Sequence, residues 1–209
     1  VFVFTLFGIW KTGAVLVPVN IMYHAEELVH AFSSTEVSKV ITDSSGVENI
    51  LSIKENLESI MVSGSRASRT DEAILDFDSE IQKHEGEFET FVPSDDDVAA
   101  ILFTGGTTGA PKAVITNHRG WYKALCDLTA GHTGSGERRK AADENVPPNI
   151  VAMPLFHGGG QQSLLFAYHI GRSVLLMEKF RVEKFINLTQ KYRVRSLVLM
   201  PTMIHDIVN

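Results

Sequence analysis

The stretch ILFTGGTTGAPKAVITN, residues 101–117, contains the most specific pattern in the chain. An apolar strand candidate leads into residues 104–112, which hold three glycines, three threonines, one proline and one lysine. Glycines allow a close backbone approach, so successive N–H groups can converge on an anion. The hydroxyls can bind phosphate oxygens or Mg²⁺, and Lys112 adds a positive charge. Because strand-like residues follow Lys112, the pattern predicts a mobile flap between two strands that covers a polyphosphate.

Two well-known phosphate loops do not fit this stretch. The P-loop pattern G-x-x-x-x-G-K-[ST] fails, because Ala110 stands five residues after Gly105 and Ala113 follows Lys112. The dinucleotide pattern G-x-G-x-x-G also fails, so a P-loop kinase is disfavoured. A plain Gly/Thr hairpin turn is the alternative, but it explains the glycines and not the hydroxyls together with a lysine.

Short β-branched runs alternate with helical patterns along the rest of the chain. This alternation predicts an α/β fold with largely parallel sheets flanked by helices, in which ligands bind beyond the C-terminal ends of the strands. The predicted strands are 15–19, 39–42, 98–103, 113–116, 150–153, 173–177 and 196–200. The predicted helices are 2–11, 25–33, 47–58, 118–130, 159–170 and 182–192.

Composition narrows the class of protein. The 209 residues suffice for one large domain or two small ones, and 44% apolar and 21% charged residues are typical of a soluble globular protein. The net charge of -6 offers no basic surface for nucleic acid or anionic lipid. Cys126 is the single cysteine, so no internal disulfide and no cysteine zinc site can form. We therefore expect a reducing compartment and a cytoplasmic location.

The two ends of the chain are apolar. Residues 1–10 have no basic segment before them and Lys11 interrupts the run, so neither a signal peptide nor a membrane span is predicted. The chain begins at Val1 inside one apolar element and stops at Asn209 in another. We expect it to be an internal piece of a larger protein.

Two polar stretches interrupt the pattern. Residues 84–97 include six acidic side chains and no Lys or Arg, which indicates a solvated connector. Residues 131–148 hold three glycines, two prolines and no aromatic residue, which indicates a long flexible loop. The predicted organisation is a first α/β subdomain over 1–130 with the phosphate loop at 103–113, the loop 131–148, and the incomplete start of a second α/β subdomain over 149–209.

Residues 103–113 resemble the signature loop of the AMP-forming adenylating superfamily, the AMP-dependent synthetases and ligases. That superfamily includes acyl-CoA synthetases, coumarate ligases, luciferases and peptide-synthetase adenylation domains, and its loop reads roughly [YF]-T-S-G-[ST]-T-G-x-P-K-G. This chain departs at Gly105, where the family commonly has serine, and at Ala113, where it commonly has glycine. The serine hydroxyl, one phosphate donor, is therefore missing. The matching residues are Phe103, Thr104, Gly106, Thr107, Thr108, Gly109, Pro111 and Lys112.

Four further segments are similar to the family in the same order. Residues 11–20, KTGAVLVPVN, resemble its KAGAV-VPLN segment, and residues 153–157, MPLFH, resemble the P-[LM]-F-H motif of acyl-CoA synthetases. Residues 158–160 with Gly171 and Arg172 are similar to its glycine-rich helix and the strand behind it, and residues 198–203 to a segment lining the acyl pocket. The resemblance implies an αβαβα-type N-terminal domain of an acyl-CoA synthetase, truncated.

The resemblance also implies the reaction and its residues. A carboxylic acid and ATP, with Mg²⁺, give an acyl-adenylate and pyrophosphate, and the thiol of CoA then gives acyl-CoA. Lys112, Thr108 and His157 would be catalytic, and Thr108 would also bind the metal. His157 would hold the substrate carboxylate or gate the thiol channel; a core histidine satisfied by backbone is the alternative. The implied nucleotide-binding residues are Thr104, Gly105, Gly106, Thr107, Thr108, Gly109 and Lys112.

Several alternatives stay open. The PLFH motif favours a CoA ligase over a peptide-synthetase adenylation domain, whereas luciferases share much of the pattern. A non-catalytic binding or scaffold module is a third hypothesis. The family's later motifs, which supply adenine, ribose and further metal contacts, are not found in the sequence. We therefore expect the isolated chain to be inactive and to associate with a second copy of itself.

Overall fold

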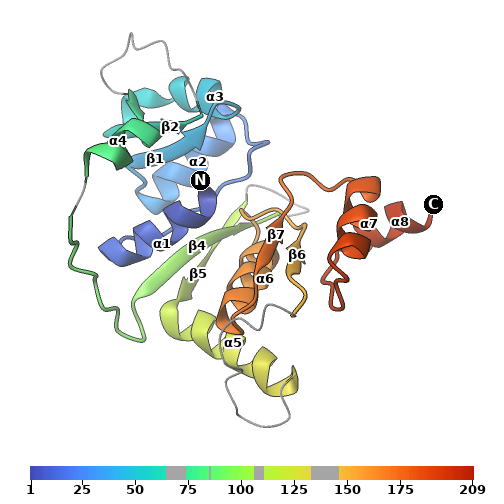
Figure 1. Ribbon diagram of the computed structural model, residues 1–209. Coiled ribbons are helices and arrows are strands. Elements are labelled where there is room, and N and C mark those ends of the chain that lie inside the picture. The colour runs from blue at the N-terminus through green and yellow to red at the C-terminus, as the bar shows by residue number, and fades with distance from the viewer. Residues whose placement is uncertain (65–73, 85, 106–110, 133–145) are drawn as a thin grey trace. The chain divides into compact units, whose positions relative to one another are not determined.

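The computed structural model describes residues 1–64, 74–84, 86–105, 111–132 and 146–209 (Figure 1). The chain forms two compact units, Val1–His118 and Arg119–Asn209. This division falls where α5 begins, whereas the predicted boundary at 131–148 lies mostly outside the described residues and stays a prediction. The mixed α/β class with largely parallel strands is confirmed.

The first unit contains a three-stranded parallel sheet in the order β1-β2-β3. Its strands are β1 (Lys39–Asp43), β2 (Ser59–Ser63) and β3 (Ile74–Asp76). The middle strand β2 buries Ile60 and Val62, which point to the same face because side chains alternate along a strand. These two residues pack in one apolar cluster with helices α2 (Ala25–Thr35) and α3 (Val47–Leu51).

Helix α2 has clear start and packing signals. The backbone N–H of His24 donates to the Glu27 carboxylate at 2.9 Å, which is one half of a capping box. Leu28, Ala31 and Phe32 are all buried, and their i, i+3, i+4 spacing places them on one face of the helix. This face covers the parallel sheet.

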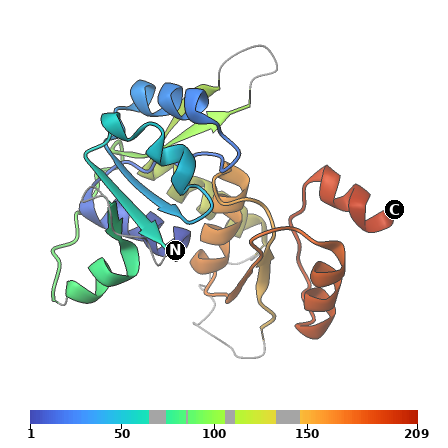
Figure 2. The same ribbon diagram turned by 90° about the horizontal axis from the view of Figure 1, so that it is seen from above.

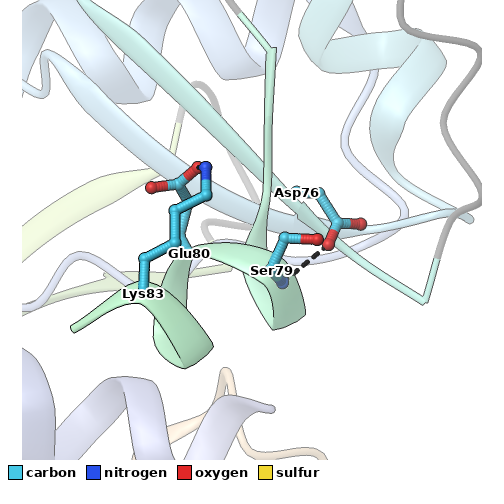
Figure 3. A network of polar contacts seen from close by, with 4 residues as sticks. All are labelled: Asp76, Ser79, Glu80 and Lys83. Atoms are coloured by element: carbon cyan, nitrogen blue, oxygen red, sulfur yellow. Dashed lines mark hydrogen bonds and ion pairs between the residues drawn. The ribbon is translucent and has the colours of Figure 1, made fainter. Parts of the chain in front are cut away.

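Helix α4 (Phe77–Lys83) starts from a strand end (Figure 3). Asp76 closes β3 and is also the N-cap of α4, where its Oδ1 accepts from the Ser79 N–H at 2.7 Å. Within the helix, Lys83 Nζ lies 2.6 Å from Glu80 Oε1. An exposed pair of this kind stabilises a helix by only a few tenths of a kcal/mol, about 0.3–0.5, so the Asp76 cap is the stronger local signal.

The remaining strands of the first unit form an antiparallel pair, β4 (Val98–Thr104) and β5 (Lys112–Asn117), which lie side by side in Figure 1. The prediction that the glycine-rich loop joins two strands is therefore confirmed. Helix α1 (Phe2–Thr12) ends at Gly13, whose φ of 79° is left-handed. The chain then passes along β4, where Leu16 forms a single parallel bridge with Ala100.

The second unit begins within α5 (His118–His132) and continues through β6 (Asn149–Val151), α6 (Gly158–His169) and β7 (Val174–Leu176). Strands β6 and β7 pair in parallel, and α6, which connects them in the sequence, contacts both. Helices α7 (Val182–Lys191) and α8 (Pro201–Val208) follow and contact each other, in red in Figure 2. An apolar cluster that includes Ile150, Met177, Phe185 and Met203 joins these helices to β6 and to the chain after β7.

Several predicted elements are wrong. Residues 15–19 form one bridge and no strand, and residues 196–200 are irregular, because apolar β-branched residues make a strand only where a partner backbone is available. The helix predicted over 47–58 is α3 followed by the short 3₁₀ helix η1 (Lys54–Asn56). Strands β2 and β3 were not predicted, because their apolar runs are short. Helices α4 and α8 were not predicted either, although Pro201 at the start of α8 is a recognised helix signal.

The acidic connector is attached to the end of α1. The Phe91 N–H donates to the Lys11 carbonyl at 2.9 Å, and a Cβ added to Gly13 would lie 2.8 Å from Cγ of the Phe91 ring. Glycine at position 13 therefore allows two things: the left-handed backbone that ends α1 and the close approach of the Phe91 ring.

We expect Gly13→Ala to destabilise the chain more than Gly64→Ala. Both glycines have a positive φ, 79° and 73°, so both substitutions place alanine in left-handed backbone, which costs about 1–2 kcal/mol. Only Gly13 adds the clash with Phe91, since no described atom lies within 4 Å of a Cβ at Gly64. Urea unfolding of both variants measures the difference. Equal losses of unfolding free energy would show that the Phe91 contact contributes nothing.

Candidate functional site

The two ends of the glycine-rich loop are brought together at the open end of the β4–β5 pair. Thr104 is the last residue of β4, Lys112 is the first residue of β5, and the two are register partners. The Thr104 hydroxyl donates to the Lys112 carbonyl at 3.4 Å, a long hydrogen bond. Both residues are exposed, so a hydroxyl and an ammonium face solvent at the mouth of the loop.

Four predicted site residues, Gly106, Thr107, Thr108 and Gly109, lie outside the described residues. Gly105 is described and exposed, and no described atom lies within 4 Å of the position that its Cβ would take. The Cβ of a serine at this position, the residue common in the family, would therefore meet no described atom within 4 Å.

The base of the β4–β5 pair is held from the N-terminal part of the chain. The Ala99 carbonyl accepts two hydrogen bonds, from the Trp10 indole N–H at 2.7 Å and from the Leu16 N–H at 3.1 Å. The Leu16 carbonyl in turn accepts from the Ile101 N–H at 2.9 Å. The segment 11–20, matched to the family from sequence, thus fixes the strand that leads into the loop. An indole N–H needs a hydrogen-bond partner when it is removed from water, and the Ala99 carbonyl is that partner for Trp10.

The far end of β5 is closed in the same region. The His118 N–H donates to the Asp97 carbonyl at 3.1 Å, and the His118 ring lies edge-on to Trp10 with 5.6 Å between ring centroids. Trp10 therefore contacts strand β4 through its indole N–H and His118, the residue that follows β5, through its ring.

The MPLFH segment forms a turn between β6 and α6 in the second unit. His157 is the N-cap of α6, with extended backbone, and its Nδ1 accepts from the Gly159 N–H at 3.1 Å. The histidine is exposed, so the alternative of a buried core histidine is wrong, although its bond to backbone is present. Because Nδ1 is an acceptor, the proton of the neutral ring is on Nε2, which is free to donate to a ligand.

The PLFH turn lies very close to the first turn of α6. A Cβ added to Gly160 would be 2.2 Å from the Pro154 carbonyl oxygen and 2.8 Å from its carbonyl carbon. No side chain fits at that distance, and backbone atoms cannot move aside cheaply. At Gly159 the same test gives 3.4 Å to His157 Nδ1 and 3.5 Å to the Met153 sulfur, which are ordinary contacts.

Two features are absent from the described part of the chain. None of its helices is both long enough and apolar enough to cross a membrane. Its histidine, cysteine and acidic side chains form no group of three or more that could hold a metal ion. The predicted metal ligand, Thr108, lies in the stretch that is not described.

The family is shown by comparison with known proteins. The model of the AMP-binding enzyme family matches residues 1–209, so the chain belongs to that family, and its predicted membership of the AMP-forming adenylating superfamily is confirmed. Among curated relatives, 4-coumarate–CoA ligase 3 of Arabidopsis thaliana is 31% identical over 206 residues, which cover 97% of this chain and 35% of that protein. Crotonobetaine/carnitine–CoA ligase of Proteus mirabilis is 30% identical over 212 residues, with 99% and 39% covered.

Solved structures show the same fold. A long-chain-fatty-acid–CoA ligase of Archaeoglobus fulgidus superposes with a TM-score of 0.77 at 26% identity, covering 99% of this chain and 39% of that one. An o-succinylbenzoate coenzyme A synthetase of Bacillus subtilis, in complex with ATP and magnesium ion, gives 0.75 at 20% identity, with 99% and 38% covered. The chain thus spans a little over a third of the length of these four proteins.

We expect Gly160→Ala to disrupt the PLFH turn and Gly159→Ala to leave it intact. The first substitution forces a methyl group against the Pro154 carbonyl, an overpacking that costs about 1–3 kcal/mol or more. The second replaces a helical glycine by a better helix former at an ordinary contact distance, which stabilises by roughly 0.5–1 kcal/mol. Urea unfolding compares the two; a Gly160→Ala variant as stable as Gly159→Ala would contradict the close approach.

Proposed function

We propose that the chain is the phosphate-binding and acyl-binding part of an AMP-forming acyl-CoA ligase. The observation that carries the proposal is the pairing of Thr104 with Lys112, which brings the ends of the family's signature loop together. Membership of the AMP-binding enzyme family supports it. The curated relatives at 30% identity or more are named as CoA ligases, which favours this subfamily over luciferase-like and peptide-synthetase enzymes.

The substrates that we propose are a carboxylic acid, ATP and CoA. In the first step a carboxylate oxygen attacks the α-phosphorus, a new P–O bond forms, and pyrophosphate leaves with the electrons of the broken P–O bond. In the second step the CoA sulfur attacks the acyl carbon and AMP leaves, with the thiol proton released to solvent. No general base is needed in the first step, because a carboxylate is already ionised at neutral pH.

The role proposed for the loop is charge neutralisation. The Lys112 ammonium and the Thr104 hydroxyl stand exposed at the loop mouth, where each can donate to the oxygens of a polyphosphate. Gly105, Gly106, Thr107, Thr108 and Gly109 are proposed to add backbone and hydroxyl donors. Mg²⁺ would neutralise further phosphate charge, with the Thr108 hydroxyl as the protein ligand; a hydroxyl oxygen suits this hard cation.

The role proposed for His157 is to bind the reacting carboxylate. Its Nδ1 is occupied by the Gly159 N–H, so Nε2–H is the group that can donate to an oxygen atom. The ring is exposed at the start of α6, where the helix N-terminus also favours an anion. Its matched place in the PLFH motif supports this role over that of a simple cap.

We propose that these 209 residues bind nucleotide without completing the reaction, in a cytoplasmic protein whose isolated chain associates with a second copy. The chain covers 35% and 39% of two CoA ligase relatives, so most of their length has no counterpart in it. An AMP-release assay with ATP, CoA and several carboxylates should show no turnover, and light scattering should show dimers or larger assemblies. Turnover near 10 per second, a typical enzyme rate, by a monomer would contradict both expectations.

We expect Lys112→Ala to weaken binding of ATP with Mg²⁺ to the chain by roughly tenfold or more. A charge-assisted hydrogen bond contributes about 1.5–3 kcal/mol, and each 1.4 kcal/mol is about tenfold. Gly105→Ser should bind at least as tightly as the unmodified chain, because it restores a family hydroxyl in open space. Isothermal titration measures both.

Lys123→Ala is the control, since Lys123 is an exposed lysine on α5 outside the loop. Pyrophosphate and adenosine are titrated as separate probes, and the Lys112→Ala effect should appear with pyrophosphate and not with adenosine. If the chain binds none of the three, the scaffold hypothesis is favoured instead. Equal losses for Lys112→Ala and Lys123→Ala would also contradict the assignment.

A further inference from the structure

A buried glutamine lies under the PLFH turn. Gln161, in the first turns of α6, is 0% exposed, a rare state for an amide side chain. Its Nε2 donates to the Leu155 carbonyl at 2.9 Å, and its backbone N–H donates to the His157 carbonyl at 3.2 Å. One residue therefore holds the turn that carries His157 at two points, one through its side chain and one through its backbone.

The orientation of the Gln161 amide is fixed by these contacts. Within the described part of the chain, its Oε1 is buried and has no hydrogen-bond partner. Turning the amide over would place Oε1 against the Leu155 carbonyl and leave the NH₂ group without an acceptor, which is worse. The nitrogen therefore faces Leu155, and the buried oxygen has no hydrogen-bond partner among the described residues.

Stability alone does not explain this residue. An unsatisfied buried oxygen is costly, whereas an apolar side chain of similar volume would fill the same space without that cost. Gln162, the next residue, is a glutamine of the same size that is only half-buried. A buried polar side chain with one of its groups unpaired is typical of a functional constraint.

We propose that Gln161 is a positioning residue for His157. Its amide fixes the Leu155 carbonyl, this fixes the turn 155–157, and the turn places His157 Nδ1 against the Gly159 N–H. The imidazole is thereby held in the tautomer that presents Nε2–H. The control of the tautomer by Gln161 is independent of the proposed function. The binding of a substrate carboxylate by Nε2–H rests on the proposed function.

The test is the tautomer of His157 in a Gln161→Met variant of the chain. Long-range ¹H–¹⁵N spectra at a pH where the ring is neutral distinguish the two tautomers, and His157→Gln identifies the His157 signals. We expect the Nε2–H form to dominate in the unmodified chain. In Gln161→Met its ratio to the Nδ1–H form should fall by roughly two- to tenfold, the bias that one hydrogen bond supplies.

Stability is measured on the same variants to separate positioning from packing. Gln161→Met should unfold at nearly the same urea concentration as the unmodified chain, because removal of the unpaired oxygen offsets loss of the hydrogen bond to the Leu155 carbonyl. Gln162→Met is the matched control and should change neither the tautomer ratio nor the urea midpoint by a measurable amount. Gln161→Leu repeats the test if the methionine variant does not fold.

Two results would overturn the proposal. One is an unchanged His157 tautomer ratio in Gln161→Met, and the other is an equal change in Gln162→Met. A carboxylate titrated in the presence of ATP and Mg²⁺ then tests the function separately, by the shift of the His157 Nε2 signal. A tautomer that depends on Gln161 with no response to carboxylate would support positioning and count against the proposed role of His157.

Discussion

The carbonyl oxygen of Ala99 is the atom on which the arrangement of the first unit depends. It accepts from the Trp10 indole at 2.7 Å and from the Leu16 backbone at 3.1 Å, so helix α1, the segment after it and strand β4 meet at one point. Ala99 and Ala100 are both 0% exposed. A larger side chain at either position would separate these elements, because the interior has no spare volume. Strand β4 continues from this contact to Thr104, where the glycine-rich stretch begins.

The second unit uses the same principle with different residues. At Gly160 the absence of a side chain lets the Pro154 carbonyl approach the helix. The Gln161 side chain adds a hydrogen bond to the carbonyl of the next residue, Leu155. In both units a backbone carbonyl near the candidate site is contacted at short range, that of Ala99 in the first and those of Pro154 and Leu155 in the second, while Lys112 and His157 stay exposed at the start of a strand and at the start of a helix. Rigid support under exposed donors is the arrangement that electrostatic stabilisation of a reaction requires.

The sequence was sufficient for the features that depend on local pattern. The loop between two strands follows from its glycines and from the strand-like residues on either side, and α2 and α6 follow from periodicity. It was insufficient where the outcome depends on distant partners. Residues 15–19 have strand-like composition but pair with β4 only at Leu16, and residues 196–200 are irregular. The Trp10–Ala99 bond joins residues 89 positions apart. The burial of Gln161 could not be predicted, because a glutamine in a helix has the composition of a surface residue.

Two neighbouring glycines at the start of α6, Gly159 and Gly160, contribute to the turn in different ways. Gly159 and Gly160 look equivalent in the sequence GGG, yet a Cβ at one meets only ordinary contacts and at the other meets backbone at 2.2 Å. Gly160 is therefore needed for geometry, whereas the N–H of Gly159 is needed for its hydrogen bond to His157. The backbone N–H is retained in almost any substitution, so position 159 tolerates change and position 160 does not. The position of His157 thus depends on the close packing of the PLFH turn against the first turn of α6 at Gly160, and not on the number of glycines in the segment.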